Sequence, residues 1–211
     1  MGCFQNALMI FQLKKGVEDK QVATIHDQIA GIYVERGDYD AAINSYNEAL
    51  SIYQVQLGER SSEVGHTLRN LGAIFDSKKD LETSYKYYMD ALKILRQSLG
   101  DNDLSVGLVL NNIGIILARQ KKYRKAIELC TVTLRIRRLQ LPKNHFEIAD
   151  TLTNLANIMD DCNKDEQALK PSIYRANSGD ETEDIANALR STIGYINIRQ
   201  RRHCRGHSPF I

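Results

Sequence analysis

Residues 64 to 105 read VGHTLRNLGAIFDSKKDLETSYKYYMDALKILRQSLGDNDLS, and they form one copy of a unit that recurs every 42 residues. Neighbouring copies keep the same class of side chain at the same position, as in the apolar column Ile29, Leu71, Ile113 and Leu155. Self-similarity at a fixed period of about 20 to 50 residues is typical of stacked supersecondary units. The sequence therefore predicts a repeat array whose core lies between neighbouring units.

Each unit contains two stretches with helical periodicity. In the second unit the apolar residues are spaced by three and four: Leu68, Leu71, Phe75, Leu81, Tyr88, Leu92 and Leu95. This spacing indicates two amphipathic helices. A short polar turn separates the two helices of a unit, at residues 36–38 and 77–80, where Gly37 supplies a permissive backbone and Asp38 and Asp80 can cap the next helix. We therefore expect each unit to be an antiparallel helical hairpin.

The second unit resembles the tetratricopeptide repeat in its order of large and small residues: Leu68, Leu71, Gly72, Phe75, Ser84, Tyr88 and Ala91. The 42-residue period, with Leu-Arg-Asn-Leu-Gly in the first helix and Ala-Leu-Lys-Ile-Leu in the second, resembles the lengthened repeats of kinesin light chains and nephrocystin-like proteins. The resemblance covers residues 1 to about 170. It implies an all-α fold, a right-handed α-solenoid superhelix of antiparallel helical hairpins.

The columns divide the chain into segments. Residues 1–21 match the second helix of a unit, and repeats follow at 22–63, 64–105 and 106–147. Residues 148–184 form a degenerate fourth repeat, because Lys170 and Pro171 fall where its second helix should run. We expect a capping helix at 185–198 and a disordered basic tail at 199–211.

The charge distribution and the spacing of the cysteines indicate the cellular compartment in which the protein is expected. The formal net charge is +2, but all acidic residues lie at or before Asp184, and five arginines follow it. The four cysteines show no paired spacing, and no apolar run approaches the roughly 20 residues that a membrane span requires. We expect a cytoplasmic protein without a membrane span.

No motif of catalysis or cofactor binding occurs. The sequence lacks a Gly-rich phosphate loop, His-Glu-x-x-His, Gly-x-Ser-x-Gly and a cysteine pair at zinc spacing. His203, Cys204 and His207 lie close together but make a poor zinc site. Cys130 replaces the tyrosines of its column and is expected to be a small core hydrophobe. We expect no enzyme, cofactor, metal or small-molecule substrate.

Polar residues of the first helices are the predicted binding site. In tetratricopeptide arrays the first helices line a concave groove, so the resemblance implies that a recurring amide ladder faces a bound peptide. An Asn amide donates and accepts, and can hold an extended backbone of any sequence. The alternative is a structural ladder that keeps the hairpins in register. The predicted groove residues are Gln28, Asn70, Asn112 and Asn154, with Arg69, Asn111 and His66 beside them.

A basic stretch in the third repeat has two interpretations. It receives an acidic partner, or it is a solvated helical face. Its members are Lys121, Lys122, Arg124, Lys125, Arg135, Arg137 and Arg138. The basic tail lacks interleaved aromatic residues, so we do not expect nucleic acid as a partner.

The predicted function is a non-catalytic scaffold or adaptor that binds a peptide segment of another protein. A kinesin-light-chain-like cargo adaptor, with a kinesin complex or its cargo as partner, is the narrower version that the resemblance implies. The competing hypothesis is a structural or regulatory fragment of a larger signalling protein.

Overall fold

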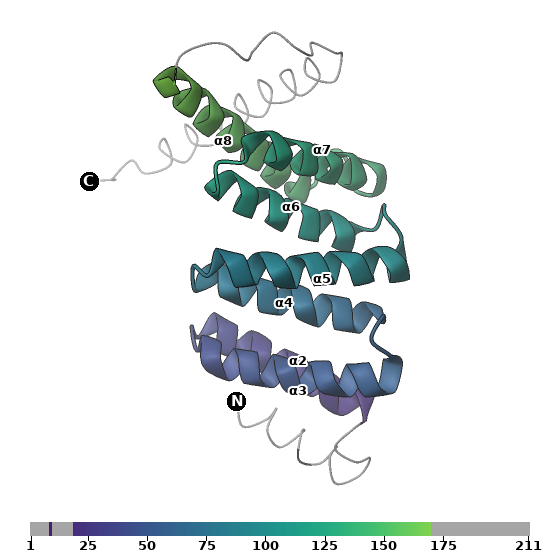
Figure 1. Cartoon of the computed structure of the whole chain (residues 1–211). Helices are drawn as coiled ribbons and strands as arrows, with labels where there is room; N and C mark the ends of the chain where they lie inside the picture. The colour runs from purple at the N-terminus through teal and green to yellow at the C-terminus, as the bar shows by residue number, and fades with distance from the viewer. Residues whose placement is uncertain (1–8, 10–18, 170–211) are drawn as a thin grey trace, which may run out of the picture. The chain divides into compact units, whose positions relative to one another are not determined.

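The computed structural model describes Met9 and residues 19–169. These residues contain seven α-helices and no strand (Figure 1). The helices are α2 (Lys20–Glu35), α3 (Tyr39–Leu57), α4 (Ser62–Ser77), α5 (Leu81–Leu99), α6 (Leu104–Arg119), α7 (Tyr123–Gln140) and α8 (Phe146–Leu169). The fold is an all-α solenoid of helical hairpins, so the predicted fold class is confirmed.

The chain forms two compact units, residues 1–116 and residues 117–211. In the described part, the first unit contains α2 to α5 and most of α6, and the second contains the end of α6 with α7 and α8. The predictions made for residues 1–8, 10–18 and 170–211, among them the capping helix and the basic tail, lie outside the described residues.

The helices keep the period of the sequence. The first helices of successive hairpins begin 42 residues apart, at Lys20, Ser62 and Leu104. The second helices begin at the same interval, at Tyr39, Leu81 and Tyr123. The same pattern of side chains thus forms the same pair of helices in three successive repeats.

The turns within the hairpins share one backbone conformation. Each has a residue with positive φ at the same position, namely Gly37 (77°), Lys79 (64°) and Lys121 (60°). Glycine adopts this conformation without steric cost, whereas each lysine accepts a cost of roughly 1 kcal/mol. The next helix is capped in two cases: Asp38 accepts a hydrogen bond from the Ala41 N–H at 3.2 Å, and Asp80 accepts one from Thr83 at 3.1 Å. The predicted caps are confirmed at these two turns.

The core of the first unit lies between helices of different hairpins. One buried cluster joins Ala30 of α2, Ala42 and Tyr46 of α3, and Leu71 and Ile74 of α4. A second cluster, nearer the other end of the same helices, also draws on all three: Val22, Ala23, Ala49, Ile52, Tyr53 and Val64. Helix α3 is therefore covered on one side by its own hairpin partner and on another by the first helix of the next repeat. This is the core arrangement expected of a repeat array.

Two glycines bring α4 and α5 close together. A Cβ atom at Gly72 would lie 2.9 Å from ring atoms of Tyr88, and one at Gly65 would lie 2.7 Å from Leu95 Cγ. The Ser84 hydroxyl of α5 donates a hydrogen bond to the Gly72 carbonyl oxygen at 2.8 Å in this buried contact. These two glycines thus permit the close packing of α4 against α5.

The second unit departs from the repeat at α8. A first helix in register with α6 would end at Asp161, because α6 ends at Arg119, but α8 continues to Leu169. The position that starts the second helix in the other repeats, occupied by an apolar or aromatic residue there, is Asp165 here. The described residues of the fourth repeat, up to Leu169, lie in one long helix.

Membrane insertion has no support among the described helices, since none combines the length and apolar character that a bilayer crossing requires.

Candidate functional site

The residues predicted to line a peptide groove all lie on first helices. Six belong to the first unit, on α2, α4 and α6: Gln28, His66, Arg69, Asn70, Asn111 and Asn112. Asn154 lies on α8 in the second unit. Gln28 is exposed, Asn111 is buried with 6 % of its surface accessible, and the other five are half-buried. Half-buried polar groups can be held by the protein and still present one edge to a ligand.

Asn70 is tied into the protein on two sides. Arg69 Nη2 donates a hydrogen bond to Asn70 Oδ1 at 2.8 Å. Burial raises the pKa of the Tyr46 hydroxyl to about 12, an effect that the negative charge of Asp27 adds to and that Arg69 and a hydrogen bond with Asn70 oppose. The Asn70 amide thus fixes the guanidinium plane of its neighbour and contacts a buried phenol, which is the behaviour of a structural ladder.

Asp27 and Arg69 form a half-buried pair of opposite charges on neighbouring first helices. Burial raises the pKa of the Asp27 carboxyl, while a hydrogen bond with Thr67 and the charge of Arg69 oppose the rise. Burial likewise lowers the pKa of Arg69, against the fields of Tyr46, Tyr88 and Asp27. Both charged groups have thus lost part of their hydration, and among the described residues no salt bridge joins them. A ligand that supplied a complementary charge or hydrogen bond here would bind more tightly, because it would replace part of the hydration that Asp27 and Arg69 have lost.

Thr67 contributes to this site and was missed at the sequence level. Its hydroxyl oxygen lies 3.0 Å from the Glu63 carbonyl oxygen and 3.4 Å from Asp27 Oδ1. The single hydroxyl hydrogen favours the shorter contact, so the bridge to Asp27 is the weaker one. The available signal was the column itself, in which Thr67 interrupts the apolar Ile25 and Val109.

Burial favours the uncharged form of the His66 imidazole. Burial lowers the pKa of its imidazole below the usual value, the positive charge of Arg69 lowers it further, and Asp103 and Glu63 act in the opposite direction. A neutral imidazole carries one donor and one acceptor. His66 therefore adds hydrogen-bonding capacity to the face beside Arg69 without adding charge.

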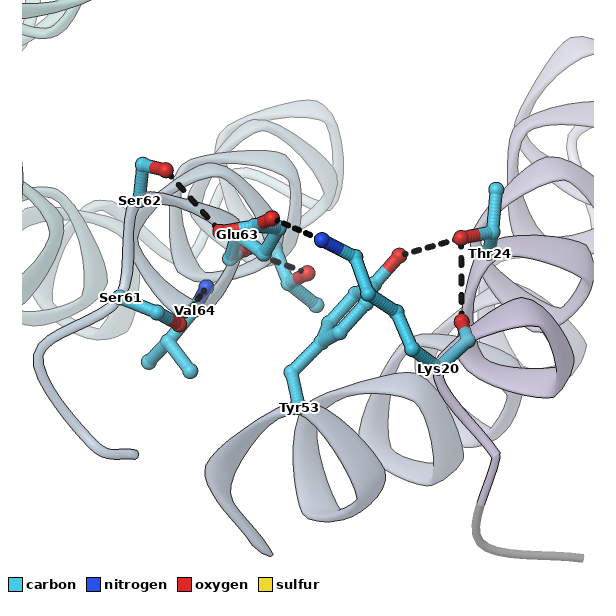
Figure 2. Close-up of polar contacts among 8 residues, drawn as sticks. Lys20, Thr24, Tyr53, Ser61, Ser62, Glu63 and Val64 are labelled. Carbon is cyan, nitrogen blue, oxygen red and sulfur yellow. Dashed lines mark hydrogen bonds and ion pairs between the residues drawn. The ribbon is translucent and has the colours of Figure 1, made fainter. Parts of the chain in front are cut away.

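A polar network joins the N-terminal ends of α2 and α4, which are the first helices of the first two repeats (Figure 2). Lys20 Nζ of α2 lies 2.7 Å from Glu63 Oε1 of α4, and this pairing raises the pKa of Lys20 and lowers that of Glu63. The Tyr53 hydroxyl of α3 donates to Thr24 Oγ1 at 3.3 Å. Figure 2 shows Tyr53 reaching between the two first helices, with Lys20 extended across it toward Glu63. The network links α2 to α4 through Lys20 and Glu63, and α2 to α3 through Thr24 and Tyr53.

One residue of the predicted basic stretch is not at the surface. Arg137 of α7 is 3 % exposed, and its Nη1 donates to the Glu147 carbonyl oxygen at 2.7 Å and to Thr151 Oγ1 at 2.6 Å. Its Nε lies 3.3 Å from Glu147 Oε2, an ion pair whose geometry gives no hydrogen bond at Nε. The prediction that Arg137 belongs to an exposed basic face is wrong, because the start of α8 folds over it. The same position is occupied by Leu95 one repeat earlier and by Tyr53 two repeats earlier, and both are buried.

Cys130 is a core residue, as the sequence predicts. It is fully buried in α7, and burial raises the pKa of its thiol to about 11, while Arg137 acts in the opposite direction. Because the folded pKa lies above the unfolded value of about 8.5, burial of the thiol contributes stability below that pH, and this contribution is lost as the pH rises toward 11.

We expect native Cys130 to resist alkylation, since at pH 8 only about one thousandth of a thiol with that pKa is ionised. Iodoacetamide followed by peptide mass mapping should label the half-exposed Cys162 in the native chain and Cys130 only in urea. Equal labelling of both cysteines without urea would contradict the buried placement.

Metal ligands do not gather among the side chains that the structure describes, where no group of three or more His, Cys, Asp or Glu could hold an ion. His203, Cys204 and His207 lie outside the described residues.

The comparisons with known proteins agree with this architecture. Residues 21–97 and 63–139 match the family model of the tetratricopeptide repeat. BtubC (BKLC) from P. vanneervenii is a similar solved structure, with 22% sequence identity and a TM-score of 0.72 over 99% of this chain and 74% of that chain. The TPR-like repeats of a candidate kinesin light chain from Podosopora anserina are also similar, with 12% identity and a TM-score of 0.64 over 92% of this chain and 85% of that chain. At these identities the likeness shows the fold alone.

The comparison with curated proteins finds no match. The two family matches overlap and together span residues 21 to 139, which is more than half of the chain. This protein therefore belongs to the tetratricopeptide repeat family.

Proposed function

We propose that this protein is a non-catalytic adaptor that binds an extended peptide segment of another protein along the first helices of its repeats. Tetratricopeptide repeats generally serve as protein-interaction scaffolds. The observation that carries the proposal is the half-buried polar face built from α2 and α4, where Asp27, His66, Arg69 and Asn70 are partly dehydrated yet still reach the surface.

The chemistry of this face suits a peptide backbone. The amides of Asn70 and Asn112 and the neutral imidazole of His66 offer both donors and acceptors, which the alternating N–H and C=O groups of an extended chain can satisfy. Asp27 and Arg69 then select among side chains by charge. A kinesin-light-chain-like cargo adaptor in the cytoplasm is the narrower form of this proposal, supported by the structural similarity to the repeats of the Podosopora anserina protein.

A structural ladder is the second candidate function of the same amides. The hydrogen bond from Arg69 to Asn70 Oδ1 and the contact of Asn70 with Tyr46 favour it. In that case the repeats act as a spacer or regulatory arm of a larger protein. Measurements of binding and stability distinguish the two candidates. Substitution of a groove residue weakens peptide binding, whereas substitution of a ladder residue lowers the stability of the fold.

The test compares two sets of asparagine substitutions in the full chain. Peptides selected from a random library on the parent are titrated against Asn70→Ala/Asn112→Ala/Asn154→Ala and against Asn44→Ala/Asn47→Ala, which removes exposed amides from α3. We expect the first variant to weaken binding by about tenfold or more, since each lost hydrogen bond is worth roughly 0.5 to 1.5 kcal/mol. The α3 control should bind as the parent does.

Circular dichroism must show equal helicity in all three proteins. Unchanged peptide affinity together with a lower unfolding midpoint in the triple variant would assign the asparagines to the structural ladder and reject the groove.

A further inference from the structure

The turn between α6 and α7 carries five cations in seven residues, and it belongs to the second unit, apart from the face proposed to bind peptide in the first. They are Arg119, Lys121, Lys122, Arg124 and Lys125, and all five are exposed. Arg124 Nε lies 3.6 Å from Glu128 Oε1, and both side chains are largely in solvent, so this pair neutralises little of the charge of Arg124. Arg119 and Lys121 each have a further interaction within the chain. The turn, defined as residues 119–125, thus presents positive charge mainly through Lys122, Arg124 and Lys125.

The fold does not require this charge. The equivalent turn of the first repeat, residues 35–41, carries a net charge of −2, and that of the second, residues 77–83, carries none, whereas residues 119–125 carry +5. All three turns place one residue at positive φ and start the second helix at the same position. One backbone therefore forms with an acidic, a neutral and a strongly basic turn.

The basic turn also costs stability. Asp38 and Asp80 cap α3 and α5, whereas Lys122 occupies the same position before α7 and makes no capping hydrogen bond. The first turn of α7 contains no acidic residue and includes Arg124 and Lys125. Cations are unfavourable at a helix N-terminus because the macrodipole is positive there. The basic turn therefore lacks the stabilising cap of the other two turns and adds unfavourable charge at the start of α7.

We infer that residues 119–125 form a docking surface for an acidic segment of a partner polypeptide. The turn requires only that the bound segment carry the complementary, negative charge. A membrane surface fits less well, because none of the large apolar side chains found exposed in the described part of the chain falls within the turn. Nucleic acid also fits less well, since the one aromatic residue, Tyr123, is half-buried and offers no open ring for base stacking.

The decisive variant is Lys122→Asp, which gives this turn the Asp that occupies the same position in the turn of the second repeat. Binding of a short fluorescent peptide of alternating glutamate and glycine to the full chain is measured by anisotropy at low salt. We expect Lys122→Asp to weaken binding about tenfold. The same variant should raise Tm by about 2 to 4 °C because it restores the missing cap. A loss of binding with a gain of stability cannot come from misfolding.

The matched control is Lys79→Asp, which changes the positive-φ lysine of the turn between α4 and α5. It should bind the peptide as the parent does. The inference is overturned if Lys122→Asp binds as tightly as the parent, if the parent binds no peptide, or if single-stranded DNA binds more tightly than the peptide. It is also overturned if binding appears only when Asp180, Glu181, Glu183 and Asp184 are changed to their amides, because the chain's own acidic stretch would then be the occupant.

Discussion

Replacing Arg137 by alanine is expected to lower the free energy of unfolding by about 3 kcal/mol, the lower end of the range for breaking a buried ion pair. The guanidinium is 3 % exposed and bonds both the Glu147 carbonyl oxygen and the buried Thr151 hydroxyl. Alanine removes both of these hydrogen bonds, leaving the Glu147 carbonyl oxygen with the Thr151 hydroxyl as donor at 2.9 Å, and opens a cavity between α7 and α8. The loss stays at the lower end because 34% of the Glu147 side chain is exposed and its carboxylate remains partly hydrated. Urea unfolding followed by circular dichroism measures the change.

A double substitution tests whether charge or packing is responsible. Arg137→Leu/Glu147→Gln removes both charges and installs the apolar residue found one repeat earlier, Leu95. Such replacement of a buried ion pair by apolar packing is often neutral or stabilising. We therefore expect the double variant to unfold near the urea concentration of the parent. An Arg137→Ala protein as stable as the parent would show that α8 does not depend on this contact.

Gly72→Leu should destabilise the first unit by about 2 to 3 kcal/mol through overpacking. Even a Cβ atom at this position would lie 2.9 Å from Tyr88 Cδ1 and Cε1, and the Ser84 hydrogen bond to the Gly72 carbonyl oxygen holds the two helices together. The leucine side chain can enter only by separating α4 from α5 or moving a buried ring. Thermal unfolding and urea titration both report the loss.

Gly31→Ala is the matched control in a first helix. A Cβ atom at Gly31 meets nothing within 4 Å, so alanine brings its better helix propensity without a clash. We expect this variant to gain about 0.5 to 1 kcal/mol. Adding a side chain to a helical glycine should therefore raise stability on α2 and lower it on α4. A loss in Gly31→Ala comparable to that in Gly72→Leu would mean that the clash with Tyr88 is not the cause.

The helices and their turns were predictable because their causes are local. Leu68, Leu71 and Phe75 lie on one face by spacing alone, and Asp80 caps the helix that follows it through a contact three residues away. Repetition strengthens these signals, since the same columns return 42 residues later. The long helix α8 shows the limit of this reasoning, because a column average gives no weight to Asp165 standing where an apolar side chain starts the second helix in the other repeats.

The polar residues could be placed on a helix but not given partners. Spacing puts Asn70 and Arg69 side by side on α4, yet it does not say that the guanidinium bonds the amide or that Tyr46 of α3 lies behind it. Arg137 illustrates the same gap, since a run of basic residues looks exposed until α8 folds over one of them. Burial depends on what a neighbouring helix contributes.

The sequence by itself determined the repeat, the two helices of each unit and the columns that form the core, because helical periodicity and a repeated pattern are properties of the chain. Only the tertiary structure decided which polar side chains are bound within the protein and which still reach the surface. Asp27, Asn70 and Arg137 owe part of their surroundings to other helices, namely α4 for Asp27, α3 for Asn70 and α8 for Arg137. Contact across helices depends on distances in space that sequence spacing does not contain.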